Sequence, residues 1–258
     1  RRAAMLRRTV ALVSGGGSGL GLAAAQRIVS AGGRVVIVDR SAIAHEAAQR
    51  LGSSAIFAQA DCTCEADIQA ALDLAESTFG SGPVNVALNT AGVLHAGKTV
   101  ARDGTPHQLE PFESVLYVNV IGSFNVARLA ASRMATREPD EDGSRGVIIH
   151  TASIAAFDGQ VGQVAYSASK GAIVGMTLPM ARDLAPLGIR VVAIAPGVFE
   201  TPMMDGAKEA VKVGLAAAIP FPKRFGRPDE FASLVTSVIS NMYLNGEVIR
   251  LDGAVRMS

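Results

Sequence analysis

Tyr166 and Lys170 stand at positions i and i+4 of a helical pattern. Residues with this spacing share one helix face, so the lysine ammonium lies beside the tyrosine phenol. A free phenol has a pKa of about 10 and is a weak base at neutral pH, but a nearby positive charge stabilises the phenolate and lowers that pKa. The pair therefore predicts a general acid/base that exchanges a proton with an alcohol or ketone. Because the spacing also occurs by chance on many helices, the pair needs further support.

Ser153 offers a hydroxyl for the same chemistry. It follows the apolar run Gly146–Thr151, which reads as a buried strand, and precedes Tyr166 in the chain. At the carboxyl end of a strand, its hydroxyl can donate a hydrogen bond to a substrate oxygen as that oxygen gains negative charge. Serine is also common in loops after strands, so ordinary loop polarity is the alternative interpretation.

A glycine-rich loop follows the first apolar run of the chain and opens a helical pattern. Glycines allow a tight turn and let backbone amides approach a pyrophosphate, and the N-terminal end of the following helix attracts that anion. Such a loop alone can be a structural turn, but its place between a strand and a helix indicates a dinucleotide site. The residues expected to bind the cofactor here are Gly15, Ser18, Gly19, Leu20 and Gly21.

Asp39 ends the second apolar run, where a carboxylate can accept hydrogen bonds from the adenosine ribose. The same carboxylate repels the 2′-phosphate of NADP, so the sequence favours NAD as the cofactor. Arg40 argues in the other direction, because a guanidinium can pair with a phosphate. The remaining alternative for Asp39 is a residue that caps the next turn.

Short apolar runs alternate with helical patterns from residue 9 onward, and most of the runs are continuous, as in parallel strands covered on both faces. This order predicts an α/β protein: a single-domain Rossmann fold over residues 9–258, with a doubly wound seven-stranded parallel sheet and helices on both faces. The expected strands are Val10–Val13, Val35–Val38, Ala55–Phe57, Val84–Leu88, Val147–His150, Arg190–Ile194 and Val248–Leu251. The expected helices are Leu20–Ser30, Ala42–Leu51, Asp67–Phe79, Phe112–Met134, Val164–Leu184 and Pro228–Ser240.

Besides two polar insertions at residues 92–111 and 137–145, two segments depart from this alternation. Residues 1–8 are basic and lack acids, and we expect them to be an extension outside the fold that fits part of an organelle-targeting segment. Residues 198–227 form a long connection after the sixth strand, at the edge of the sheet where ligands bind in such folds. We therefore expect this second segment to have a functional role.

The composition excludes several classes of protein. With 49% hydrophobic and 18% charged residues, the 258-residue chain can bury a large core, and its formal net charge of +1 indicates neither a nucleic-acid partner nor a membrane surface. No purely apolar run reaches about 18 residues, so no transmembrane helix is expected. Cys62 and Cys64 are too close for an unstrained disulfide, and neither they nor the four histidines have the spacing of metal ligands. We therefore expect reduced thiols and no metal site.

Together these motifs resemble the short-chain dehydrogenase/reductase family over essentially the whole chain. The resemblance rests on the glycine-rich loop, Asn89-Thr90-Ala91-Gly92, Asn119, Ser153, Tyr166, Lys170 and Pro196-Gly197. It implies that Asn119 joins Ser153, Tyr166 and Lys170 in the catalytic set by holding a water that links Lys170 to solvent. Two departures, Ser14 for threonine and Thr90 for asparagine, lie away from this proton path.

The resemblance also implies contacts with NAD beyond the glycine-rich loop. Asp61 and Cys62 would lie against the adenine, and Lys170 would bind the nicotinamide ribose. The other residues implied at the cofactor are Asn89, Ala91, Gly92, Tyr166, Pro196, Gly197, Val198 and Thr201.

Within the family, the chain is most similar to enzymes that act on 3-hydroxyacyl-CoA in fatty-acid β-oxidation and also on hydroxysteroids. This similarity lies in Gly146–Ile154, Ala165–Ala185, Asn245–Ala254 and the insertions around Lys98–Leu109 and Glu138–Ser144. It implies reversible oxidation of a (3S)-3-hydroxyacyl-CoA to the 3-oxoacyl-CoA by NAD, with Gln160 and Gln163 beside the substrate. It also implies that residues 203–222, within the segment 198–227, form a substrate lid, the alternative being an amphipathic helix that packs on the core or on another subunit. It further implies a homotetramer, in the mitochondrial matrix of a eukaryote or in the cytoplasm of a bacterium.

Two alternatives stay open at this point. The first is an enzyme of the same fold that acts on other 3-oxoacyl thioesters, hydroxysteroids or secondary alcohols. Biosynthetic reductases of the first kind usually favour NADPH, so nucleotide preference separates them. The second is a noncatalytic partner or scaffold in a multiprotein assembly, a role that does not need the intact set of Ser153, Tyr166, Lys170 and Asn119.

Overall fold

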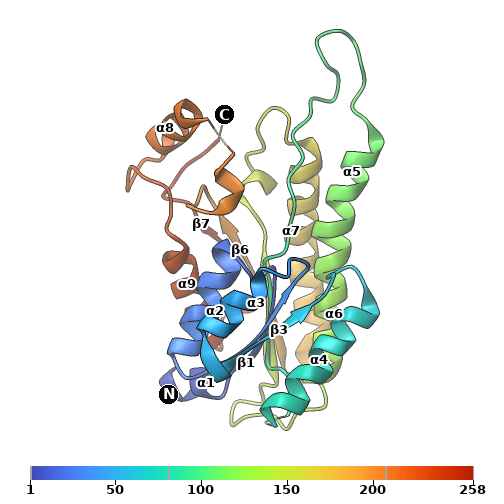
Figure 1. Cartoon of the computed structure of the whole chain (residues 1–258), viewed down its shortest axis with the longest axis vertical. Coiled ribbons are helices and arrows are strands. Elements are labelled where there is room, and N and C mark those ends of the chain that lie inside the picture. Colours follow the sequence, from blue (N-terminus) through green and yellow to red (C-terminus); the bar gives the residue numbers. More distant parts are fainter. Residues whose placement is uncertain (1, 81, 207, 258) are drawn as a thin grey trace.

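A computed structural model describes residues 2–80, 82–206 and 208–257. Its centre is a seven-stranded sheet in the order β3-β2-β1-β4-β5-β6-β7, and every pair of neighbouring strands is parallel (Figure 1). The strands are β1 (Val10–Ser14), β2 (Arg34–Asp39), β3 (Ala55–Gln59), β4 (Val86–Asn89), β5 (Gly146–Thr151), β6 (Ile189–Pro196) and β7 (Val248–Leu251). The predicted Rossmann fold is thus confirmed, with strand ends displaced by only one or two residues.

Helices cover both faces of the sheet. The longer ones are α1 (Arg2–Arg7), α2 (Gly19–Ser30), α3 (Ala44–Arg50), α4 (Glu65–Phe79), α5 (Leu109–Leu116), α6 (Ser123–Met134), α7 (Val164–Leu184), α8 (Glu209–Ala218) and α9 (Pro228–Ser240). Short turns of helix lie at η1 (Gly52–Ser54), η3 (Ile154–Ala156), η4 (Ala185–Leu187) and η5 (Pro202–Met204), and η2 (Tyr117–Gly122) is a π-helix.

Two apolar clusters hold these layers together. One lies between the sheet and α4, α6 and α7, and the other between the sheet and α2, α3 and α9 (Figure 1). All five residues of β1 and all eight of β6 are buried, which explains their continuous apolar sequences. The sheet is therefore a rigid base whose strand ends hold the loops in fixed positions.

The strand order reverses between β1 and β4. The chain runs outward from β1 through β2 to β3, and then from β4 toward the opposite edge at β7. In open α/β sheets of this kind, the crevice at the carboxyl ends of the strands beside such a reversal binds the ligand. The loops after β1, β4, β5 and β6 meet at this edge.

The N-terminal segment differs from the expectation. Residues predicted to lie outside the fold form α1, and Leu6 is only 7% exposed in the cluster that contains α2 and α9. A basic sequence of this length carried too few apolar residues to indicate a helix, and the helix is stabilised by packing against α9 instead.

The predicted helix over residues 112–134 is continuous but changes type in the middle, from α5 through the π-helix η2 to α6. By length and composition alone, Leu109–Met134 could cross a membrane, although 56% of its most apolar window is buried inside the protein. The contacts of α6 with α4, β4 and β5 account for this apolar character.

Candidate active site

A cavity of about 550 Å³ opens at the carboxyl edge of the sheet. It runs from the end of β2, past the glycine-rich loop, to η5 and α8. Most of the residues that the sequence singled out line it: Gly15, Ser18, Gly19, Leu20, Gly21, Asp39, Asp61, Cys62, Ala91, Gly92, Ser153, Gln160, Gln163, Tyr166, Lys170, Pro196, Gly197, Val198 and Thr201. Asn89 and Asn119 are buried beneath its surface.

The glycine-rich loop turns tightly between β1 and α2. Gly15 has a φ of +68°, a conformation that other residues rarely adopt, and its amide donates to the carbonyl of Val38 at 2.8 Å. A Cβ atom on Gly21 would collide with the carbonyl oxygen of Gly15 and the hydroxyl of Thr90. Ser18 precedes α2 without capping it through its side chain, so the first amides of the helix remain for an anion in the cavity. These features fit the pyrophosphate of a dinucleotide.

Asp39 lies where β2 ends, and backbone amides hold its carboxylate. Gly17 donates to Oδ2 at 3.1 Å and Ser41 donates to Oδ1 at 3.0 Å, so the carboxylate is fixed at the wall of the cavity. Arg40 lines the same cavity, and its Nη1 lies 3.7 Å from Oδ2 of Asp61. The side chain that could have received a phosphate is therefore paired with an acid.

The catalytic side chains converge from two elements. Ser153 follows β5, and its Oγ accepts a hydrogen bond from the amide of Ala155 at 3.1 Å. Tyr166 and Lys170 project from the first turns of α7, with the lysine Nζ 5.7 Å from the centre of the tyrosine ring. Lys170 donates from Nζ to the carbonyl of Thr151 at 2.7 Å. This bond ties the start of α7 to the end of β5.

Burial governs the electrostatics of this centre. It lowers the pKa of Lys170 to about 8, and it raises the pKa of Tyr166 above its ordinary value, against the hydrogen bond from Ser153. The lowering of the phenol pKa that the sequence predicted is therefore not produced by the chain alone. A low dielectric disfavours the charged phenolate, and this effect outweighs the opposing effect of Ser153.

Asn119 lies in the π-helix η2, and wide turns of this kind are frequent at functional sites. Its Oδ1 accepts from the amide of Val93 at 2.8 Å, and its Nδ2 donates to the carbonyl of Val93 and to Oγ of Ser169, both at 2.9 Å. A Cβ atom on Gly92 would lie 3.2 Å from Oδ1 of Asn119 and 3.7 Å from Nζ of Lys170, so both side chains face the same point. Both amide hydrogens of Asn119 are used, so only Oδ1 has a free lone pair for a water.

Comparisons with known proteins agree with this geometry. The family model for short chain dehydrogenases matches residues 9–212. This chain belongs to the short-chain dehydrogenase family. Human 3-hydroxyacyl-CoA dehydrogenase type-2 is 56% identical over 250 residues, which cover 96% of this chain and 95% of the human protein.

Two solved structures extend the comparison. The 3-hydroxyacyl-CoA dehydrogenase type-2 of Mycobacterium avium has a TM-score of 0.93 and 42% sequence identity, covering 97% of this chain and 96% of that one. The 3-ketoacyl-(acyl-carrier-protein) reductase of Brucella melitensis, complexed with NADH, has a TM-score of 0.84 and 31% identity, covering 95% and 97%. This short-chain dehydrogenase is thus an oxidoreductase that uses a nicotinamide cofactor and a small-molecule substrate.

The sequence places the substrate at the end of the cavity that lies beyond Ser153. Gln160 and Gln163 both line it, and the side-chain oxygen of Gln163 accepts from the amide of Gln160 at 3.0 Å. The expected lid faces this end only in part. Met203, Met204 and Leu215 line the cavity, whereas Val211, Val213 and Phe221 are at least half exposed to solvent. A helical turn can direct only one of its faces inward, so the apolar residues of the lid divide between two surfaces.

Two buried residues support the site from below. Asn89, expected to line the cofactor cleft, instead accepts from Oγ of Ser14 at 3.3 Å and donates to the carbonyl of Ser123 at 3.2 Å. Its Nδ2 also lies 3.1 Å from Nδ1 of His150, which is fully buried and has a pKa lowered to about 4 by burial and by the charge of Lys170. Sequence reasoning missed His150, although a histidine at the end of the apolar run Gly146–Thr151 was a signal of a buried polar contact.

Proposed function

We propose that this dehydrogenase interconverts a 3-hydroxyacyl-CoA and the corresponding 3-oxoacyl-CoA, using NAD. One observation carries the proposal: a single cavity joins a dinucleotide cradle to an apolar end, with Ser153, Tyr166 and Lys170 between them. The 56% identity to a 3-hydroxyacyl-CoA dehydrogenase over nearly the whole chain supports the choice of substrate.

Bound NAD would supply the acceptor for the hydride that leaves the substrate carbon. The glycine-rich loop and the start of α2 would hold its pyrophosphate, and Asp39 would accept hydrogen bonds from its adenosine ribose. Ser153 orients the substrate oxygen, and Tyr166 takes the hydroxyl proton during oxidation and returns it during reduction. Lys170, with a pKa of about 8, can pass that proton on near neutral pH, and Asn119 holds the loop beside it.

The preference for NAD over NADP rests on the end of β2. The Asp39 carboxylate is fixed by two backbone amides, and Arg40 is turned toward Asp61. A 2′-phosphate would meet a negative charge that cannot move away.

The test is reduction of acetoacetyl-CoA by NADH, with NADPH in parallel. We expect turnover with NADH and a kcat/KM at least ten times lower with NADPH, since one unfavourable charge contact of about 1.4 kcal/mol corresponds to a factor of ten. Asp39→Asn should narrow that difference, and Asp61→Asn should narrow it as well, because it releases Arg40 to pair with the phosphate. If the enzyme turned over hydroxysteroids but not acetoacetyl-CoA, the proposed substrate would be wrong. If NADH and NADPH were used equally well, Asp39 would not determine the cofactor preference.

The assembly follows as part of the same proposal. Tyr117, Ile121 and Phe124 on η2 and α6, together with Leu178 on α7, are all more than 40% exposed, which supports association through this face in a homotetramer. Light scattering should give four times the 26.6 kDa chain mass.

The proposed compartment is the mitochondrial matrix in a eukaryote or the cytoplasm in a bacterium, which fractionation of the source cells would decide.

A further inference from the structure

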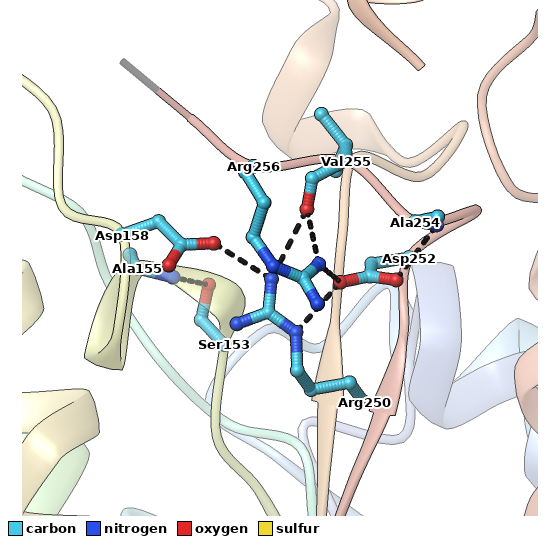
Figure 2. A network of polar contacts seen from close by, with 8 residues as sticks. All are labelled: Ser153, Ala155, Asp158, Arg250, Asp252, Ala254, Val255 and Arg256. Carbon is cyan, nitrogen blue, oxygen red and sulfur yellow. Dashed lines mark hydrogen bonds and ion pairs between the residues drawn. The ribbon is translucent and has the colours of Figure 1, made fainter. Parts of the chain in front are cut away.

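An arginine on the edge strand β7 connects three separate segments (Figure 2). Arg250 donates from Nη2 to Oδ2 of Asp158 at 2.7 Å and from Nε to Oδ2 of Asp252 at 2.8 Å. Its Nη2 also reaches the carbonyl of Val255 at 3.1 Å, and its guanidinium lies 5.3 Å from the ring centre of Phe157. The planar fork of arginine suits such a divided contact better than the point charge of lysine.

Asp158 connects this arginine to the catalytic serine. Its amide donates to the carbonyl of Ile154 at 2.8 Å, one residue after Ser153, and the turn η3 lies between them (Figure 2). The side chains of Arg250 and Asp158 are 22% and 16% exposed, so the ion pair is partly shielded from water and from salt. A displacement of Arg250 would therefore reach the Ser153 loop directly.

Asp252 folds the segment after β7 back over the site. Its Oδ1 accepts from the amide of Ala254 at 3.0 Å, and its Oδ2 accepts from Arg256 at 3.1 Å as well as from Arg250. Ala254 has a φ of +67°, the only positive φ of a non-glycine residue in the described part of the chain. An alanine is strained in this conformation, so the surrounding contacts must hold the turn in place.

Beyond the turn, the chain enters the substrate end. Val255 is buried against Ile154 and Ile219, and Met257 packs on the same cluster. Met257 also lines the cavity that contains Ser153 and Gln160. The segment thus touches both the catalytic loop and the lid.

We propose that residues 252–257 form one wall of the substrate site, that Met257 is a specificity-determining residue for the acyl chain, and that Arg250 is a positioning residue that ties this wall to the Ser153 loop. The proposal rests on the function proposed above and adds to it the residue that limits the acyl chain. A flexible thioether suits a wall that meets chains of different length.

The role of Met257 is tested by chain-length preference. We expect Met257→Ala to raise the ratio of kcat/KM for a ten-carbon 3-oxoacyl-CoA to that for acetoacetyl-CoA about fivefold, and Met257→Phe to lower it, because the apolar end is enlarged in one variant and filled in the other. Met242→Ala, a methionine outside this cavity, should leave the ratio unchanged. A ratio within twofold of wild type in both Met257 variants overturns this role.

The role of Arg250 is tested with Arg250→Gln, Arg250→Lys and Asp158→Asn. All three should raise the KM for acetoacetyl-CoA about tenfold and speed amide hydrogen exchange in residues 153–158, while the Kd for NADH stays within twofold. Arg133→Gln is the matched control, because Arg133 also holds two carboxylates, Asp73 and Glu76, but far from the cavity. Unchanged KM and exchange, or full rescue by lysine, overturns the positioning role.

These readouts separate the two proposals. If the wild-type enzyme fails to reduce acetoacetyl-CoA, the proposed function is wrong, and with it the acyl-chain role of Met257. Hydrogen exchange at residues 153–158 needs no substrate, so it still decides whether Arg250 holds the loop.

Discussion

At the scale of single residues, burial sets the chemistry of the site. Lys170 is only 5% exposed, and this burial lowers its pKa to about 8, so its charge can change near neutral pH. Burial raises the pKa of Tyr166, which favours the protonated phenol. The tyrosine is therefore prepared as an acid for reduction, and its action as a base calls for the positive charge of an oxidised nicotinamide.

Replacement of Tyr166 by phenylalanine tests this assignment. The change removes only the hydroxyl that exchanges the proton, so kcat should fall by a factor of about 10³. Fluorescence titration should give an unchanged Kd for NADH, which would show that the site is still folded. A variant that keeps more than a tenth of the wild-type kcat would contradict the mechanism.

His150 makes a separate prediction about pH. Its pKa falls from 6.5 in the unfolded chain to about 4 in the folded protein, so between these values the unfolded state binds more protons and stability decreases as the pH falls. From pH 7 to pH 4.5 this residue alone should lower the free energy of unfolding by roughly 2 kcal/mol.

His150→Asn keeps a polar partner for Asn89 but does not titrate. In urea denaturation the free energy of unfolding of this variant should fall by roughly 2 kcal/mol less than that of wild type over that pH range. An equal loss in both proteins would mean that His150 does not contribute to the acid sensitivity.

At the scale of elements, backbone contacts place the side chains. The turn between β1 and α2 depends on the close approach of Gly21 to Gly15 and Thr90. The π-helix η2 directs Asn119 toward Val93, and the start of α7 is joined to the end of β5 through Lys170. The site is thus assembled where secondary-structure elements end or change type.

Gly21→Ala tests the turn. The added methyl group would push the loop away from α2, and we expect the Kd for NADH to rise at least tenfold. Gly52→Ala is a suitable control for the substitution, because Gly52 has open space around its Cβ position, although its φ of +74° adds local strain. NADH affinity equal to wild type in Gly21→Ala would show that the loop does not bind the cofactor.

The helix α1 makes a second prediction at this scale. Leu6 is 7% exposed and packs in the cluster with α2 and α9. Leu6→Ala should therefore lower the free energy of unfolding by about 2 kcal/mol. This value is at the low end for a buried leucine, because a helix at the chain terminus can shift to fill part of the space. Chemical denaturation measures this change. A loss below about 0.5 kcal/mol would mean that α1 is not docked on the fold.

At the scale of the whole molecule, the cavity joins segments from both halves of the sheet. Loops after β1, β2, β4, β5 and β6 all contribute to it, so a bound dinucleotide connects elements that are far apart in the sequence. A ligand that binds only the folded state stabilises it by mass action.

NADH at about 100 times its Kd should therefore add about 2.7 kcal/mol of stability and raise the Tm by roughly 5–10 °C. Calorimetry with and without NADH measures the shift. NADPH at the same concentration should raise the Tm by less. In the Gly21→Ala variant, NADH should raise the Tm only slightly. A Tm that NADH leaves unchanged would contradict the proposed cofactor site.

Local patterns were sufficient to predict much of this protein. The continuous apolar runs indicated buried parallel strands, the glycine-rich loop indicated a tight turn between a strand and a helix, and the spacing of Tyr166 and Lys170 placed both on one helix face. Each of these features depends on residues close together in the sequence, whose hydrophobic periodicity and backbone preferences determine the local structure directly.

Contacts between distant segments were decided only by the tertiary structure. Asn89 lies beneath the cleft because Ser14 and His150 flank it on neighbouring strands, and α1 is ordered because α9 lies beside it. The pKa of Tyr166 is raised because burial, which requires the whole fold, outweighs the hydrogen bond from Ser153. Pairings and dielectric environments of this kind arise only when the complete chain is packed, so no local pattern can encode them.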